Sequence, residues 1–272
     1  MTIGASTSNL YPALTEEALD RLLKLGFREL EVFVNTESEL DPAFIAMLRE
    51  KAEGCGARIL AVHPYVSGTE PYLLFSQYER RLRDGMRIYE RIFAAARELG
   101  AGLVVMHGDK LGGVLSVEES VARFERLFDL GRDLGVTLAQ ENVYRFRSSD
   151  VDYIRAMRAQ LGEKAHFVLD VKQARRCGLE PERVIDAMGD RIAHVHISDR
   201  DDHRDCLVPG RGTRDFPALI RHLQAAGFNG CLMMELYRTN FGEPEELLEG
   251  CQVLEEALRS AGEADGRLSK NC

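Results

Sequence analysis

The sequence predicts a single closed (β/α)8 barrel. A short apolar run followed by a longer amphipathic stretch recurs eight times along the chain, which is typical of parallel strands joined by helices. No Pro- or Ser-rich linker divides the 272 residues, and barrels of this kind have roughly 250. An open doubly wound sheet fits less well, because no G-x-G-x-x-G loop follows the first strand. We expect the barrel to span residues 1–260 and a flexible C-terminal tail to span residues 261–272.

Each strand candidate is a short run of mainly apolar, often β-branched residues. In chain order the eight candidates are residues 2–5, 29–34, 58–63, 103–107, 137–141, 166–171, 193–198 and 231–236. The helix candidates between them start at polar residues such as Thr15 and Asp41, and Ser116 forms a capping box with Glu119. Four of these candidates end at a glycine, as expected for a left-handed helix C-cap: Gly26, Gly100, Gly135 and Gly227.

The composition is that of an ordinary globular protein with a sizeable core. Hydrophobic residues make up 45% of the chain and charged residues 29%, which excludes the disordered and fibrous classes. With 35 basic and 44 acidic residues the formal charge is −9. The chain therefore lacks the overall basic character of nucleic-acid-binding proteins, which disfavours nucleic acid as the main partner and favours a small molecule.

The cysteine pattern and the N-terminus favour a cytoplasmic protein. The cysteines are scattered without a C-x-x-C pair, as expected for reduced thiols: Cys55, Cys177, Cys206, Cys231, Cys251 and Cys272. The N-terminus lacks the basic and apolar regions of a signal peptide. No stretch approaches the ~18–20 apolar residues of a membrane span, so no membrane partner is expected.

Polar side chains occur where the strand candidates end. The carboxyl ends of barrel strands form the active-site face, so these residues are candidates for function. They are Glu31, His63, His107, Glu141, Asp170, Lys172, His196 and Glu235. Residues two apart on a strand share a face, so Asp170 is expected to share its face with Lys172, and His196 with His194.

Several carboxylates and an imidazole would then meet at the mouth of the barrel. Unpaired buried carboxylates are costly, and a divalent cation is their natural counter-charge. A mixed oxygen and nitrogen donor set suits Mn, Mg, Co or Zn, and the sequence does not choose among them. We therefore expect one divalent metal ion as the cofactor.

Eight short segments carry a family resemblance. They are GFRELEVF (26–33), AVHP (61–64), VVMHGD (104–109), QENV (140–143), FVLDVKQA (167–174), HVHISD (194–199), VPGRGTRDF (208–216) and MMELY (233–237). In this order they resemble the xylose isomerase-like TIM barrel superfamily. That superfamily is the sugar phosphate isomerase/epimerase group, which also contains the family 2 AP endonucleases and inosose dehydratase.

The resemblance implies the chemistry of the site. It implies a metal ion bound by Glu141, Asp170, His196 and Glu235. It also implies that Glu141 and Glu235 are the catalytic pair, one removing a proton from the carbon next to a carbonyl and the other returning one, while the metal stabilises an enediolate. The expected protein is a metal-dependent sugar or sugar phosphate isomerase or epimerase. Its substrate is a small carbohydrate, and family members are often homo-oligomers.

Further residues receive roles around this centre. Substrate binding is expected from His63, His107, Lys172, Gln173 and Arg211. For the two histidines, a core position with a hydrogen bond to a backbone carbonyl is the alternative, and for Arg211 the alternative is a plain surface position. His194 is expected one layer deeper in the barrel than His196. The resemblance implies that Glu31 points inward and supports the site, with a structural pair of Glu29 and Glu31 as the alternative.

Two positions depart from the family pattern and limit what the resemblance implies. Many members have histidine where this chain has Gln173, and the three-metal endonucleases need a histidine near the position of Cys206. Both departures, together with the acidic charge, count against a multi-zinc AP endonuclease-like hydrolase. Cys206 as a thiolate ligand of a soft metal remains an alternative. An inosose-type dehydratase and a non-catalytic sugar-binding protein also remain open as functions of the chain.

Overall fold

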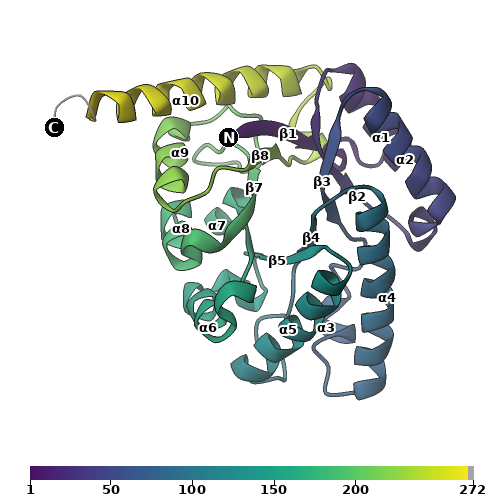
Figure 1. Cartoon of the computed structure of the whole chain (residues 1–272). Coiled ribbons are helices and arrows are strands. Elements are labelled where there is room, and N and C mark those ends of the chain that lie inside the picture. Colours follow the sequence, from purple (N-terminus) through teal and green to yellow (C-terminus); the bar gives the residue numbers. More distant parts are fainter. Residues whose placement is uncertain (269–272) are drawn as a thin grey trace.

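Eight parallel strands close into a barrel in which each strand pairs with its neighbours in the sequence, and β8 pairs with β1 (Figure 1). The computed structural model describes residues 1–268, with side chains described through residue 262. The predicted (β/α)8 barrel is confirmed. The strands are β1 (Thr2–Ser6), β2 (Glu29–Phe33), β3 (Arg58–His63), β4 (Leu103–Met106), β5 (Thr137–Glu141), β6 (Phe167–Asp170), β7 (Ile192–Ile197) and β8 (Cys231–Met234). Every predicted strand end lies within two residues of the observed one.

Helices surround the barrel on its outer side (Figure 1). They are α1 (Thr15–Lys24), α2 (Pro42–Gly54), α3 (Glu70–Leu73), α4 (Glu79–Glu98), α5 (Val117–Asp133), α6 (Val151–Leu161), α7 (Val171–Arg176), α8 (Pro181–Met188), α9 (Phe216–Ala225) and α10 (Glu246–Leu268). The last helix packs against α9, and its C-terminal end projects beyond the barrel. Residues 261–268 of the expected tail belong to α10, and residues 269–272 lie outside the described residues.

Local sequence signals explain several helix ends. The capping box at α5 is confirmed: Glu119 N donates to Ser116 Oγ at 3.1 Å, and Ser116 N donates to Glu119 Oε2 at 2.7 Å. The four glycines predicted as helix C-caps all have positive φ. Thr15 is the first residue of α1 and not its cap, because its hydroxyl group donates to Glu39 Oε2 at 3.0 Å.

The interior of the barrel contains an apolar layer below the polar strand ends. Its buried members are Ala61, Leu103, Val105, Ala139 and Val168. They are separate from the larger apolar core between the strands and the helices. Because alternate strand residues share a face, Ala139 and Val168 lie directly below Glu141 and Asp170. The apolar layer therefore supports the polar side chains at the mouth.

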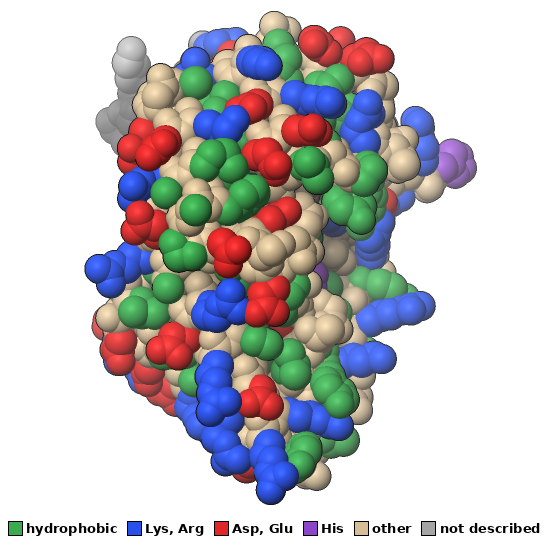
Figure 2. Space-filling view, turned by 90° about the vertical axis from the view of Figure 1, so that its right-hand side faces the viewer, with side chains coloured by type: hydrophobic (Ala, Val, Ile, Leu, Met, Phe, Trp, Pro, Cys, Tyr) green, Lys and Arg blue, Asp and Glu red, His purple; other side chains and the backbone are tan. Residues whose placement is uncertain are grey.

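The surface carries charges of both signs. Acidic and basic side chains lie next to one another over most of the face in Figure 2. Within residues 1–268, no helix is both long enough and apolar enough to cross a lipid bilayer.

We expect Gly131→Ala to destabilise the barrel although alanine normally favours a helix. A Cβ atom at Gly131 in α5 would lie 2.8 Å from the backbone oxygen of Val136 and 3.0 Å from the ring of Phe93. Relieving this overlap should cost about 1–3 kcal/mol, more than the roughly 1 kcal/mol that alanine gains over glycine in a helix. Urea denaturation measures the change. In the control Gly54→Ala, the new Cβ has no neighbour within 4 Å, so an equal loss there would contradict this explanation.

Candidate active site

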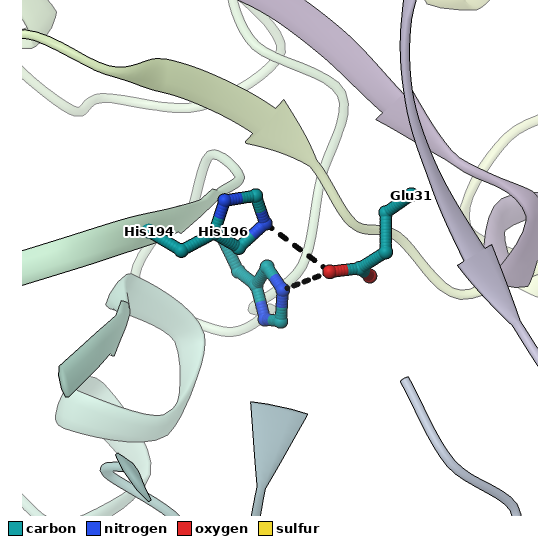
Figure 3. A group of neighbouring side chains, drawn as sticks. All are labelled: Glu31, His194 and His196. Carbon is teal, nitrogen blue, oxygen red and sulfur yellow. Dashed lines mark hydrogen bonds and ion pairs between the residues drawn. The ribbon is translucent and has the colours of Figure 1, made fainter. Parts of the chain in front are cut away.

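A carboxylate that contacts two histidines through one oxygen forms the lower layer of the site (Figure 3). Oε2 of Glu31 on β2 is 3.1 Å from Nε2 of His194 and 3.1 Å from Nε2 of His196, both on β7. Burial alone would raise the pKa of Glu31, but the two imidazoles hold that pKa well below its usual range. Burial would lower the pKa of His196, but Glu31 and Glu235 raise it well above its usual range. The structure thus places His194 one layer below His196, as expected from the strand alternation, with Glu31 in contact with both rings.

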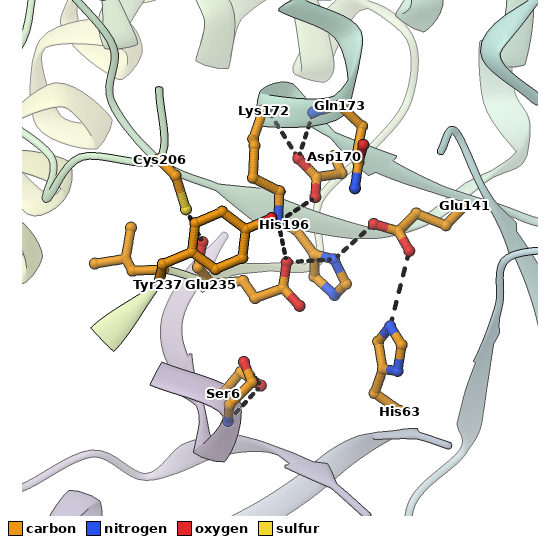
Figure 4. A network of polar contacts seen from close by, with 12 residues as sticks. Ser6, His63, Glu141, Asp170, Lys172, Gln173, His196, Cys206, Glu235 and Tyr237 are labelled. Carbon is orange, nitrogen blue, oxygen red and sulfur yellow. Dashed lines mark hydrogen bonds and ion pairs between the residues drawn. The ribbon is translucent and has the colours of Figure 1, made fainter. Parts of the chain in front are cut away.

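Four side chains meet above this layer at the carboxyl ends of neighbouring strands (Figure 4). They are Glu141 at the end of β5, Asp170 at the end of β6, His196 on β7 and Glu235 directly after β8. One ligand atom from each lies within 4.8 Å of the others. Since Nε2 of His196 contacts Glu31, its Nδ1 faces the carboxylates, 3.4 Å from Glu141 Oε1 and 3.6 Å from Glu235 Oε2. The structure therefore brings together the residues assigned to a metal ion.

Both glutamates of this group are held in the ionised form. Burial alone would raise the pKa of Glu141, but His107, at 3.0 Å, and His196 hold it well below its usual range. Burial would also raise the pKa of Glu235, but Lys172 and His196 lower it. Two ionised carboxylates therefore meet in a largely buried site.

The strand alternation predicted for Lys172 is wrong. Strand β6 ends at Asp170, whose Oδ1 accepts hydrogen bonds from the backbone N–H groups of Lys172 at 2.7 Å and Gln173 at 3.0 Å. Asp170 thereby caps helix α7, so Lys172 lies on a helix and not on the strand. Its side chain nevertheless turns back to the site, with Nζ 3.1 Å from Asp170 Oδ2 and 2.9 Å from Glu235 Oε2. Burial raises the pKa of Asp170 to about 6 even though Lys172 opposes the shift.

The other expected substrate-binding residues fall into two groups. His63 and His107 belong to the site, because their Nε2 atoms are 3.2 Å apart and both rings adjoin Glu141. Gln173 instead accepts a hydrogen bond from Tyr144 N at 3.1 Å. Arg211 is drawn to α10, where it pairs with Glu246 and, at 2.8 Å, with Glu249. The structure does not bring Arg211 to the site.

A cavity of about 450 Å³ opens above the cluster. Its lining combines aromatic rings with a few polar groups: Ser8, Tyr11, Phe33, Asn35, Tyr65, Lys172, Glu235, Leu236 and Tyr237. Such a mixture of rings and convergent polar groups is typical of small-molecule sites. Glu235 and Lys172 are the predicted site residues that reach this lining.

Two buried polar residues that the sequence did not single out hold the site in shape. Asn9 donates through Nδ2 to Met234 O at 3.0 Å and accepts from Leu236 N at 2.6 Å, which fixes the chain on both sides of Glu235. Glu70 accepts from Gly108 N at 2.6 Å, next to His107. Asn9 lies shortly after β1 and Glu70 is the first residue of α3, and neither belongs to a motif that would have indicated its partner.

Cys206 is a buried thiol and belongs to none of the potential metal-ligand groups among the described residues. Burial raises the pKa of Cys206 to about 12, and its Sγ donates to Glu235 O at 3.6 Å. We expect Cys206 to resist iodoacetamide at about pH 8 because the thiolate is the reactive form. Peptide mass spectrometry should show alkylation of the exposed Cys55 under the same conditions and of Cys206 only in urea. Equally fast labelling of both cysteines in the native protein would contradict this assignment.

The family model for xylose isomerase-like TIM barrels matches residues 19–257. The chain belongs to this family. An uncharacterised protein of Mycobacterium leprae is 26% identical over 258 residues, covering 86% of this chain and 88% of the relative. Fructoselysine 3-epimerase of Escherichia coli O157:H7 is 22% identical, covering 84% of this chain and 88% of the relative. The crystal structure of a D-tagatose 3-epimerase-like protein superposes with a TM-score of 0.81 at 20% identity, covering 97% of this chain and 99% of that one.

The residues present in this member of the xylose isomerase-like family fit a divalent ion. Three carboxylates and one imidazole form a hard, mixed donor set. Asp170 Oδ2 and Glu141 Oε2 are buried and have no hydrogen bond among the described residues, and each has an ion-pair contact instead, with Lys172 Nζ at 3.1 Å and with His107 Nε2 at 3.0 Å. Buried oxygens of this kind are costly unless a cation approaches them. His63 and His107 form a further potential ligand group with Glu141.

Proposed function

We propose that the chain is a divalent-metal-dependent isomerase or epimerase of a small sugar or sugar phosphate. The observation that carries the proposal is the meeting of Glu141, Asp170, His196 and Glu235 within 4.8 Å, at the edge of a cavity large enough for a small sugar. The epimerase names among the relatives support a carbohydrate substrate.

The four residues would hold one ion, with Mn, Mg, Co and Zn all compatible with the donor set. When bound, such an ion supplies Lewis-acid stabilisation of the negative charge on an enediolate. Glu31 orients His196 through its Nε2 atom, so that Nδ1 remains directed at the carboxylates. The backbone contacts of Asn9 hold Glu235 in register with the other ligands.

Glu235 and Glu141 are the proposed acid/base pair. Glu235 faces the cavity and is ionised, so it can accept a proton from the carbon next to the carbonyl of a bound ketose. Glu141 lies on the other side of His196 and is ionised, so it must take up a proton before it can return one to the same carbon from a different direction. The adjoining His107, with Nε2 at 3.0 Å, can supply that proton. His63, His107 and Lys172 are proposed to contact the oxygens of the substrate.

The test is solvent-proton exchange. The metal-depleted protein is reloaded separately with Mn²⁺, Co²⁺, Mg²⁺ or Zn²⁺ and incubated in D₂O with ketopentoses and ketohexoses, with and without phosphate. NMR should detect deuterium at the carbon next to the carbonyl together with an epimeric or isomeric product. Loss of water from the product would favour the dehydratase. Sugar binding without exchange would favour a non-catalytic binding protein.

A further inference from the structure

The ammonium group of Lys172 lies against the proposed metal ligands. Its Nζ donates to Glu235 Oε2 at 2.9 Å and is 3.1 Å from Asp170 Oδ2. The side chain is 6% exposed, and the ring of Tyr237 covers the ammonium at 5.0 Å from the ring centroid (Figure 4). The ammonium is therefore enclosed by protein groups and largely shielded from solvent.

These contacts involve oxygens that a metal ion would need. Oε2 of Glu235 is the oxygen that faces Nδ1 of His196, at 3.6 Å. Oδ2 of Asp170 is the free oxygen of that carboxylate, because Oδ1 is engaged by the backbone of α7. The ammonium thus neutralises one of the three carboxylate charges and occupies the approach to two of the four ligands.

We propose that Lys172 competes with the divalent ion, so that metal binding requires its ammonium to leave Asp170 and Glu235. This inference rests on the proposed metal site and deepens it. In the metal-free protein the ammonium holds the two carboxylates together and limits their mutual repulsion. In the metal-bound protein it is displaced towards the cavity, whose wall already includes Lys172, and there it can donate to an oxygen of the substrate.

If Lys172 competes with the ion, removing its charge should lower the stability of the metal-free protein and raise the affinity for the metal ion. Without the ammonium, the metal-free protein should be less stable, because the carboxylates repel one another. The affinity for the ion should rise, because no cation has to be displaced from two ligands. A merely structural role of Lys172 would lower the stability but would not tighten metal binding.

The experiment compares the full-length protein with Lys172→Met and Lys172→Arg. Isothermal titration calorimetry with Mn²⁺ on the metal-depleted proteins gives the dissociation constants, and thermal melting in EDTA gives the stabilities. We expect Lys172→Met to bind Mn²⁺ at least ~10-fold more tightly than the wild type, because the ammonium no longer repels the metal ion in a buried site. We also expect the metal-free variant to melt at a lower temperature. Lys172→Arg keeps the charge, so its affinity should not rise.

Lys164→Met is the matched control for charge. Lys164 pairs with Glu125 and Asp129 on the outer side of the barrel, and its removal should leave the Mn²⁺ affinity unchanged. The competition would be overturned if Lys172→Met bound Mn²⁺ with the same affinity as the wild type or more weakly. The metal site itself would still be supported in that case, provided that the wild type binds Mn²⁺ and that Asp170→Asn abolishes this binding. Failure of every protein to bind Mn²⁺, Co²⁺, Mg²⁺ or Zn²⁺ would overturn the metal site and the competition together.

Discussion

Glu235→Gln should lower kcat on the substrate found in the exchange screen by ~10²–10⁴, the usual contribution of a positioned acid/base group. The amide keeps the size of the side chain and its place beside the cavity, but it cannot accept a proton from carbon. It also removes one charged ligand from the metal group. The measurement is the rate of deuterium incorporation at saturating metal, which separates the lost base from weakened metal binding.

Glu249→Gln provides the control for this substitution. Glu249 is exposed on α10 and contacts Arg211, away from the cavity. Its replacement should leave kcat unchanged, and it also tests whether the Arg211 contact matters for turnover. Full activity of Glu235→Gln would contradict the proposed acid/base role, whereas a parallel loss in both variants would indicate a general effect of removing acidic side chains.

The fold could be predicted because its signals are local. Alternating apolar runs, capping residues and helix-ending glycines all act within a few residues, and the eight strands followed from them. The ligand group could be predicted as well, since parallel strands in sequence order bring their carboxyl ends to one face. What the sequence supplies in this case is the order of the strands and the residue at the end of each.

The residues whose positions differ from the prediction depend on contacts that no local pattern contains. A strand face for Lys172 requires the strand to extend past Asp170, whose side chain instead caps a helix. The loop position of Arg211 predicts a place near the substrate, but Glu246 and Glu249 come from a helix far along the chain. Asn9 interacts with the backbone more than 200 residues away, at β8. Such long-range partners can be identified only from the three-dimensional structure.

Glu31→Gln should destabilise the metal-free protein by about 2–4 kcal/mol, because it removes one partner of a buried ion pair and leaves the other charge uncompensated. Glu31 is 0% exposed, and both of its histidine partners are also buried. The amide cannot balance the positive charge that Glu31 favours on His196. Thermal or urea denaturation in EDTA at about pH 6 measures the loss.

Glu29→Gln on the same strand is the matched control. Glu29, whose side chain is 12% exposed, pairs with Arg58, whose side chain is 71% exposed. Water can solvate Arg58 once the pair is broken, so the substitution should cost about 1 kcal/mol. An equal loss of stability in the two variants would show that the contacts of Glu31 with His194 and His196 do not contribute more than an ordinary ion pair.

The pH dependence of the Glu31→Gln effect follows from the two pKa shifts. The pKa of Glu31 is lowered on folding, so its contribution is fully present above its usual value of 4.5 and is lost as the pH falls through the folded pKa. The pKa of His196 is raised on folding, so its contribution is fully present below 6.5 and is lost as the pH rises through the folded pKa. The difference in melting temperature between wild type and Glu31→Gln should therefore be largest between pH 4.5 and 6.5 and should narrow on both sides. A difference that stays constant from acid to alkaline pH would mean that Glu31 stabilises the barrel by packing and not by its charge.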